Sequence, residues 1–155
     1  MKKLILLTLL LLHLLTFSQN NYWQQEADYH MVVDVNVENH TYNGTQKLVF
    51  TNNSPETLDR VFYHLYFNAF KPGTDLEQNS RYSKDDSRTM SKNILMLDEN
   101  DWGDVQIKWM LQDGKPLEFK VEETILDVAL ERPVKSGEST TLEMEFYIQT
   151  PAMIR

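Results

Sequence analysis

Apolar and polar side chains alternate with a period of two over Thr140–Gln149, and this alternation constrains the fold more than any other feature of the sequence. Successive side chains of a β-strand point to opposite faces, so the pattern predicts a strand with one buried and one solvated face. The residues predicted to point inward are Leu142, Met144, Phe146 and Ile148. Strands of this kind bury their apolar faces against one another, which favours a sandwich or a strongly curved sheet.

The first third of the chain predicts a strand, a turn and a returning strand. Tyr29–Val37 alternates and is predicted as a long half-buried strand. In the stretch Asn39–Gly44 that follows, Asn43-Gly44 predicts a tight hairpin turn, because both residue types accept positive φ angles. The returning strand, Gly44–Thr51, places Leu48 and Phe50 on one face, and Asn52–Pro55 ends it.

The stretch Val61–Phe70 is the most aromatic in the chain and is predicted to be a central strand. One face would carry Val61, Tyr63, Leu65 and Phe67, and the other would carry Phe62, His64, Tyr66 and Asn68. A strand with apolar or aromatic groups on both faces is expected to be covered on both sides and not to lie at an edge. A lone histidine such as His64 is more often a hydrogen-bonded structural residue than a ligand or a base.

The remainder of the chain contains a long polar stretch and then further strands. Within Lys71–Gly103, Ser87 is predicted to cap a short helix that carries Met90, Ile94 and Leu97 at helical spacing. After it, Val105, Ile107, Trp109 and Leu111 are predicted to share one strand face. Turns are expected at Asp113-Gly114 and Ser136-Gly137, with strands over Leu117–Val121 and over Ile125–Leu130, the latter ended by Pro133. About seven strands in all indicate an all-β fold, either a β-sandwich or saddle-like curved antiparallel sheets.

Composition and motifs exclude several classes of site. The 155 residues suit one domain, and the absence of cysteine excludes disulfides, thiolate metal sites and a catalytic thiol. A formal net charge of −8 disfavours nucleic acid as a partner. The acidic segment Asp98–Asp104 is interpreted as a solvated turn and not a calcium loop, since Trp102 stands where an oxygen ligand is needed. His13, His30, His40 and His64 show no metal-ligand spacing, so no catalytic, substrate-binding or metal-binding residue is assigned to this chain.

Residues 1–18 are predicted to be a signal peptide. Lys2 and Lys3 are followed by the apolar run Leu4–Leu15 and by Thr16-Phe17-Ser18, a pattern typical of a cleavage site. The apolar run is shorter than the roughly 20 residues that span a bilayer, so no stable membrane span is expected, although an uncleaved anchor is the alternative. Residues 19–155 would then be a periplasmic or extracellular domain with 13 basic and 23 acidic residues, a net charge of −10.

Several local features, in their order along the chain, resemble the N-terminal domain of the aminopeptidase N family of zinc metallopeptidases, the gluzincin aminopeptidases. The most specific are Thr51-Asn52-Asn53-Ser54 leading into Phe62–Tyr66, and Pro133 with Gly137-Glu138 before the strand Leu142–Phe146. The resemblance covers nearly all of residues 22–155. It implies a saddle-like all-β domain that docks a thermolysin-like catalytic domain and shapes one wall of the substrate cleft.

The same resemblance places the chemistry outside this chain. In the family, the later domain carries a His-Glu-x-x-His helix with a more distant Glu as zinc ligands, and a Gly-x-Met-Glu-Asn stretch that binds the substrate's amine. Neither motif occurs here, and the family's cleft glutamine is not placed, since Arg155 precedes the segment where it is expected. The chain is thus expected to be a fragment or truncated relative that is inactive alone. No cofactor is expected in this chain, and zinc is expected in the catalytic domain of the parent protein. Peptide substrates are expected to contact this chain only as part of that parent protein.

Docking on a catalytic domain requires an exposed apolar surface. The expected contributors are Phe62 and Tyr66 and the terminal run Pro151–Ile154. The alternative function is a free-standing exported β-sandwich that binds glycan or protein through Tyr22, Trp23 and Trp102, and a small exported hydrolase with an unrecognised site is a third possibility.

Export predicts a defined new N-terminus. Mass measurement or N-terminal sequencing of the exported protein should find a chain that starts at Gln19, because the signal peptidase cleaves after small residues such as Ser18. Placing an arginine in the apolar run, as in Leu9→Arg, should abolish export and cleavage. An intact Met1 on a soluble cytoplasmic protein would contradict the prediction.

Overall fold

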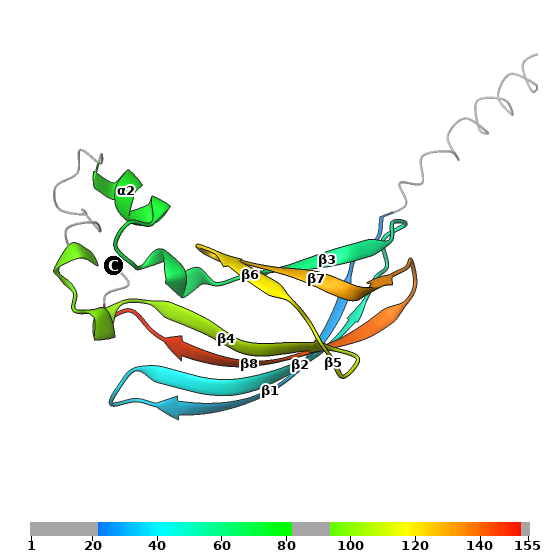
Figure 1. The fold of residues 1–155 in the computed structure, drawn as a ribbon, viewed down its shortest axis with the longest axis horizontal. Helices are drawn as coiled ribbons and strands as arrows, with labels where there is room; N and C mark the ends of the chain where they lie inside the picture. Colours follow the sequence, from blue (N-terminus) through cyan, green and yellow to red (C-terminus); the bar gives the residue numbers. More distant parts are fainter. Residues whose placement is uncertain (1–21, 82–93, 153–155) are drawn as a thin grey trace, which may run out of the picture.

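The computed structural model of the chain describes residues 22–81 and 94–152, and these residues form two antiparallel sheets packed face to face (Figure 1). Eight strands belong to the two sheets, with a few short helical segments beside them. The predicted all-β sandwich class is therefore confirmed.

The larger sheet has five strands in the order β1-β2-β8-β4-β5. Their bounds are β1 Glu26–Asn36, β2 Thr41–Thr51, β8 Ser139–Gln149, β4 Asp104–Gln112 and β5 Lys115–Pro116. β8 lies in the middle of this sheet, between β2 and β4. Leu142, Met144 and Phe146 are buried and Ile148 is half-buried, so the predicted inward face of β8 is confirmed.

The smaller sheet has three strands in the order β3-β7-β6. Their bounds are β3 Leu58–His64, β7 Ile125–Val134 and β6 Phe119–Glu122. The chain leaves the larger sheet after β5 and enters the smaller one at β6, so only the second part of the predicted strand Leu117–Val121 is confirmed: Leu117 and Glu118 lie between the sheets, and Phe119–Val121 belong to β6. β7 also continues through Pro133, where the prediction ended it. A proline has no N–H to donate to a neighbouring strand, but the register shift between Leu58 and Arg60 leaves this part of β7 without regular pairing to β3.

The helical segments lie together at one end of the sandwich, beyond β3 and β4 (Figure 1). They include the 3₁₀ turn η1 Tyr66–Ala69, the helix α2 Asp75–Arg81 and the 3₁₀ turn η3 Glu99–Asp101, and residues 94–96 are also helical. The predicted helix cap Ser87 and Met90 fall outside the described residues, whereas Ile94 from the same prediction is buried.

The first hairpin turns earlier than predicted. Its turn occupies residues 37–40, where His40 adopts a positive φ of 55°, and Asn43 and Gly44 lie inside β2. The glycine is needed there for space and not for a turn. A Cβ at Gly44 would stand 2.6 Å from Cζ of Phe146 on β8 and 2.9 Å from the carbonyl oxygen of Val32 on β1, both closer than real contacts allow.

The prediction that Val61–Phe70 forms one central strand is wrong. β3 ends at His64 and lies at the edge of the smaller sheet, with β7 in the middle. The backbone N–H of Leu65 donates to Thr124 O at 2.7 Å, after which the chain turns into η1. The inward face was predicted correctly, since Leu65 is buried and Val61 and Tyr63 pack against the core.

The face predicted for β4 is also interrupted. Val105 and Ile107 point into the sandwich, but a bulge between Ile107 and Trp109 shifts the register. Beyond the bulge Met110 is the buried residue, and Trp109 turns outward, where its indole N–H donates to Glu145 Oε2 at 2.8 Å. A bulge adds one residue to a strand, so the inward positions move by one.

A buried asparagine joins the two sheets at the end opposite α2. Asn52, which is 0% exposed, donates from Nδ2 to Val134 O on β7 at 2.9 Å and to Glu56 O at 2.7 Å. Its Oδ1 accepts hydrogen bonds from the backbone N–H and the hydroxyl of Ser54 and from Gln25 Nε2. The side chain therefore satisfies backbone groups of segments that no sheet ladder connects.

A second amide does the same between β4 and β7. Gln112 donates from Nε2 to Arg132 O at 2.8 Å and accepts from Arg132 N–H at 3.0 Å, so it pairs with β7 as a strand backbone would. Beside it, Asp113 accepts hydrogen bonds from Thr141 N–H, Thr140 Oγ1 and Arg132. The bond from Thr141 N–H, followed by Arg132, lowers the pKa of the Asp113 carboxyl. Asp113 and Gly114 have φ angles of 49° and 81°, and the hairpin turn predicted there is confirmed.

A third amide holds the helical end. Asn68 of η1 donates from Nδ2 to Glu123 O at 2.9 Å and accepts from Val105 N–H at 2.7 Å, which links the two sheets again. Gly103 packs against the backbone of η1, because a Cβ at this position would stand 2.1 Å from Phe67 O.

Replacing Asn52 by alanine should destabilise the protein by about 3 kcal/mol or more, because several buried backbone groups would lose their partner without access to water. Urea unfolding of the purified chain measures the change. The neighbouring Asn53 is exposed, and Asn53→Ala should cost no more than about 1 kcal/mol. Equal losses for the two variants would show that the buried amide does not hold the sheets together.

Candidate functional site

Strand β1 carries a row of exposed apolar side chains, which we call the open flank: Tyr29, Met31, Val33 and Val35. Every one of the eleven residues of β1 is exposed, so the prediction of a half-buried strand over Tyr29–Val37 is wrong in its burial, and β1 begins three residues earlier and ends one residue earlier than predicted. The four residues of the open flank are 44–52% exposed. They lie on the face that continues the interior, since Tyr29 pairs with Leu48 and Met31 with Gln46 across β2.

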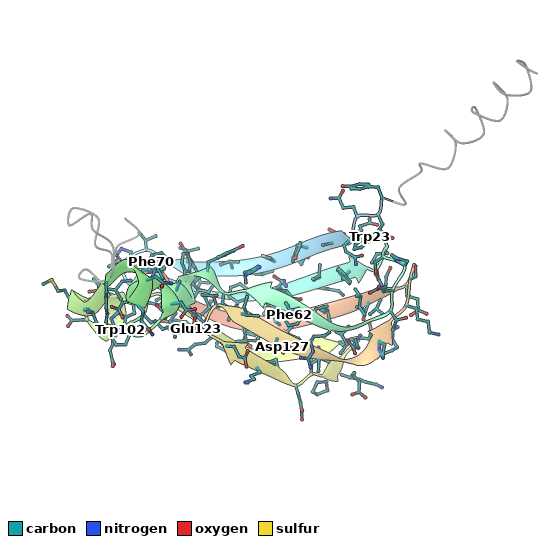
Figure 2. All side chains as sticks on the ribbon, turned by 90° about the horizontal axis from the view of Figure 1, so that it is seen from above. Trp23, Phe62, Phe70, Trp102, Glu123 and Asp127 are labelled. Atoms are coloured by element: carbon teal, nitrogen blue, oxygen red, sulfur yellow. The ribbon has the colours of Figure 1, made fainter. Side chains whose placement is uncertain are left out.

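The open flank is exposed because the two sheets differ in width. Three strands cover the inner face of a five-strand sheet, and they lie over the strands near β8. Figure 2, which views the sandwich from above, shows β1 beyond the margin of the smaller sheet. An apolar row that continues a core past its cover is the pattern of a surface that another element covers.

The exposed aromatics of β3 and η1 add to the apolar surface of the molecule. Phe62 is 62% exposed and Tyr66 is 72% exposed, as expected for contributors to a contact surface. The ring of Tyr66 stacks on that of His64, with centroids 5.2 Å apart. At the end of the chain Pro151 is buried and Ala152 is exposed, while Met153 and Ile154 lie outside the described residues.

Titratable residues do not gather into a metal site in the part of the chain that the structure describes. No group of three or more His, Asp or Glu side chains there is arranged to hold an ion. Asp98–Asp104 contains η3, and its last residue, Asp104, pairs with Lys71 and begins β4. The segment thus forms a 3₁₀ turn before β4, with Asp98, Glu99 and Asn100 exposed.

One buried carboxylate was not singled out by the sequence. Glu77 of α2 is fully buried and accepts hydrogen bonds from Gly73 N–H at 3.1 Å and from Arg81. The hydrogen bond from Arg81 lowers the pKa of Glu77, so its carboxylate is ionised at neutral pH. The i,i+4 spacing of Glu77 and Arg81 is the signal from which the pair could have been predicted.

The aromatic residues named for a glycan-binding surface do not form one platform. Trp23 and Trp102 lie at opposite ends of the molecule (Figure 2). Trp102 is half-buried, and its indole N–H donates to Leu97 O at 3.2 Å. Tyr22 is 85% exposed but lies at the end that holds Trp23.

Among the described helices, none has the length and apolar character needed to cross a membrane.

Solved structures similar to this chain include M1 zinc metallopeptidases. A two-domain M1 zinc metallopeptidase bound to L-arginine is 16% identical, with a TM-score of 0.47, and the likeness covers 81% of this chain and 19% of that one. An M1 zinc metallopeptidase from Deinococcus radiodurans gives the same four values. A two-domain M1 zinc metallopeptidase bound to L-tryptophan is 16% identical with a TM-score of 0.47, covering 84% of this chain and 21% of that one. The chain spans about a fifth of the length of these proteins. No protein-family model and no curated protein matches the sequence.

The open flank predicts self-association of the chain. At raised concentration, light scattering or sedimentation should detect oligomers despite the negative charge, because the apolar row and the free edge of β1 are exposed together. The double substitution Met31→Lys with Val33→Lys should shift the chain toward monomer and change the unfolding free energy by no more than about 1 kcal/mol.

The matched control for this prediction is Val32→Lys. Val32 is equally a β1 residue and is 63% exposed, but it lies on the opposite face of the strand. It should alter self-association less than the double substitution does. A monodisperse monomer at every concentration tested would contradict the prediction.

Proposed function

We propose that residues 19–155 are the non-catalytic N-terminal domain of an exported zinc aminopeptidase-like metallopeptidase, which docks the catalytic domain and shapes one wall of its substrate cleft. The proposal is supported by the sequence resemblance to that family and by one observation above all, the open flank. The core of this domain continues into the open flank, where the apolar side chains are left about half exposed to water. A second domain of the same polypeptide that packs on the open flank would bury these side chains.

The dimensions of the open flank suit an interdomain contact. Tyr29 to Val35 spans about 20 Å along the strand, at roughly 3.3 Å per residue. Contacts between domains of one chain typically bury about 600–1,500 Å². The row alone provides a part of such an area, and Tyr66, which lines the same opening between the sheets as Met31, extends it.

The opposite face of β1 suits solvent. It carries Asp28, His30 and Asp34, all exposed, and Val32 is its one large apolar residue. Covering the open flank would therefore bury apolar groups and leave the charged groups of the same strand hydrated, which is the arrangement that costs least in desolvation.

In this proposal the chemistry belongs to the catalytic domain. Zinc, its ligands and the group that binds the substrate's amine reside there, and peptides reach this domain only as the lining of the cleft. Its own contribution is to position the catalytic domain and to limit the width of the cleft. The signal peptide would place the whole protein in the periplasm or outside the cell.

The test compares this chain with a longer product expressed from the same reading frame. Hydrogen exchange of the two proteins should show that the amides of β1 become protected in the longer one, because a docked domain covers the free strand. Amides of β8 around Met144 lie in the middle of the sheet and should be protected equally in both. A stop codon directly after Arg155 with no peptidase gene nearby, or β1 exchange that is unchanged in the longer protein, would contradict the proposal.

A matched pair of substitutions locates the contact. Met31→Glu places a charge on the open flank and should weaken docking, lower the melting temperature of the longer protein and reduce its peptidase activity. Val32→Glu places the same charge on the other face of β1 and should leave all three nearly unchanged. Equal effects of the two substitutions would show that docking does not use the open flank.

A further inference from the structure

The outer edge of β1 pairs with no other strand of the described residues. β1 is eleven residues long and runs beside β2 in one unbroken register, from Glu26 opposite Thr51 to Asn36 opposite Thr41. It contains no proline, glycine, lysine or arginine, and no bulge interrupts its pairing with β2. A long, regular strand with a free edge presents a row of backbone N–H and C=O groups with which another strand can pair.

The other three sheet edges of the described chain are protected against such pairing. β5, at the far side of the larger sheet, consists of only Lys115 and Pro116, and a proline has no N–H to donate. β6 has four residues, of which Lys120 and Glu122 are charged. β3 carries a register shift beside Arg60. Short strands, charges, prolines and bulges are the devices by which proteins keep sheet edges from pairing, so β1 is the one long and unbroken edge among the described strands.

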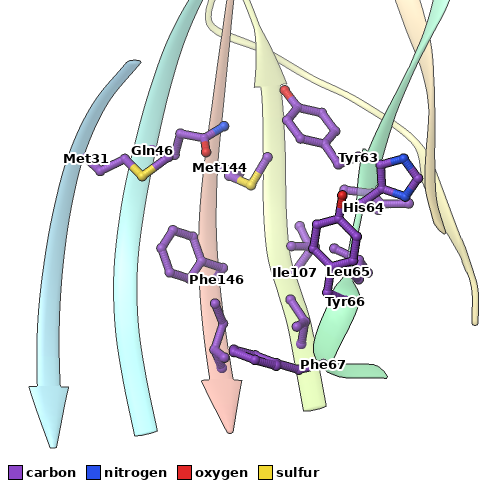
Figure 3. Close-up of a pocket in the computed structure, with 13 residues that line it drawn as sticks. Met31, Gln46, Tyr63, His64, Leu65, Tyr66, Phe67, Ile107, Met144 and Phe146 are labelled. Carbon is purple, nitrogen blue, oxygen red and sulfur yellow. The ribbon is translucent and has the colours of Figure 1, made fainter. Parts of the chain in front are cut away.

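The two faces of β1 differ in chemistry. Met31 points to the interior, where it lies beside Gln46 of β2 and lines a cavity of about 340 Å³ between the sheets (Figure 3). The other residues of the open flank share this face, because side chains alternate along a strand. The opposite face carries Asp28, His30, Val32, Asp34 and Asn36. A strand that pairs with β1 must therefore offer apolar groups on one face and partners for carboxylates on the other.

A second copy of β1 meets both requirements in one register. Residues directly opposite each other in an antiparallel pair point to the same face, so a two-fold axis between two copies of β1 places one residue opposite itself. With the axis at Val32, every residue of the open flank is opposite another one, and on the other face His30 lies opposite Asp34 on both sides of the axis. The pairs are Tyr29 with Val35, Met31 with Val33, His30 with Asp34 and Asp28 with Asn36.

The neighbouring registers fit less well. An axis at Met31 places Asp28 opposite Asp34, and an axis at His30 places Glu26 opposite Asp34. Like charges directly opposite each other destabilise a strand pair. A shift by one residue in the other direction, past Val32, leaves Asp34 opposite an apolar residue. The register about Val32 is thus favoured by both faces of the strand.

We propose that β1 of a second copy of this chain pairs antiparallel with β1 about a two-fold axis at Val32, which joins the two larger sheets into one continuous sheet. The paired segment, Asp28 to Asn36, is roughly 26 Å long at about 3.3 Å per residue. An imidazole donates an N–H to a carboxylate in its neutral and in its protonated form, so the His30–Asp34 pairs form at neutral pH. The inference goes beyond the proposed docking and does not rest on it, because pairing uses the edge of β1 and docking uses its inner face.

A single introduced cysteine tests the register, since the chain has no cysteine of its own. Val32→Cys places two thiols directly opposite each other across the axis, at a separation that suits a disulfide. With oxidised glutathione as the oxidant, this variant should form a covalent dimer. His30→Cys lies on the same face, but its two thiols are roughly 13 Å apart along the strands, so it should form at least about tenfold less. A mixture of His30→Cys and Asp34→Cys should cross-link, because these positions face each other.

A charge exchange tests the same register without a covalent bond. Sedimentation of the unsubstituted chain should show a monomer–dimer equilibrium with a dissociation constant between about 10 µM and 1 mM, as expected for a small interface. His30→Asp places carboxylates opposite Asp34 twice and should weaken dimerisation about five- to thirtyfold. Adding Asp34→Lys to it restores two pairs of opposite charge and should return the dissociation constant to within about threefold of the original value.

Two observations keep this comparison separate from folding and from net charge. His30 lies opposite Lys47 of β2 in its own chain, so a carboxylate at this position has a partner in the monomer and should not lower the melting temperature. Ser136→Asp also adds a negative charge, in the exposed turn between β7 and β8, and should leave dimerisation nearly unchanged.

Three results would overturn the proposal. They are a monomer at every concentration tested, equal cross-linking of Val32→Cys and His30→Cys, and a charge exchange that does not restore dimerisation. Self-association that Met31→Lys with Val33→Lys abolishes, but that neither cross-links at Val32 nor responds to His30→Asp, would assign the contact to the faces of the open flanks and would also overturn it.

Discussion

Three buried side-chain amides hold the two sheets of this protein at a fixed separation, and the other features depend on them. Asn52 and Gln112 join the sheets at one end, and Asn68 joins them at the other. Each amide forms hydrogen bonds with backbone groups that the strand ladders leave unpaired. It thereby removes the free-energy cost of burying those backbone groups without a partner. An apolar side chain in the same place would fill the space but would leave several carbonyl oxygens without donors. The separation of the sheets is thus set by hydrogen bonds of defined length, whereas the apolar core fills the space between them.

The difference in width between the sheets produces both the open flank and the cavity. Three strands cover the region around β8, where the side chains are fully buried, and the cover ends before β1. Met31 belongs to the exposed row and also to the rim of the cavity, so the two features meet at one residue. A catalytic domain docked on the open flank would close the mouth of the cavity.

The correct and the incorrect sequence predictions differ in the interactions on which they depend. The alternation of β8 predicted its face correctly because that strand is covered on one side along its whole length. For β1 the same alternation predicted a buried face, but its burial depends on how far the other sheet extends, which no local pattern encodes. Asn43-Gly44 has the residues of a turn, yet Gly44 is required by the ring of Phe146, about a hundred residues later in the chain. In Val61–Phe70 the aromatic content predicted a central strand, but β3 ends at His64 and the chain turns into η1 after Leu65 donates its N–H to Thr124 O.

The sequence by itself determined the all-β class, the positions of most strands, the Asp113-Gly114 turn and the absence of cysteine chemistry, because these follow from side-chain periodicity, backbone preference and composition within a few residues. The tertiary structure decided which strands lie at an edge, which apolar faces remain open, and which residues of the two sheets line one cavity. These outcomes depend on contacts between residues far apart in the chain. These contacts form only when both sheets are in place. A sequence pattern that extends over ten residues therefore does not predict them.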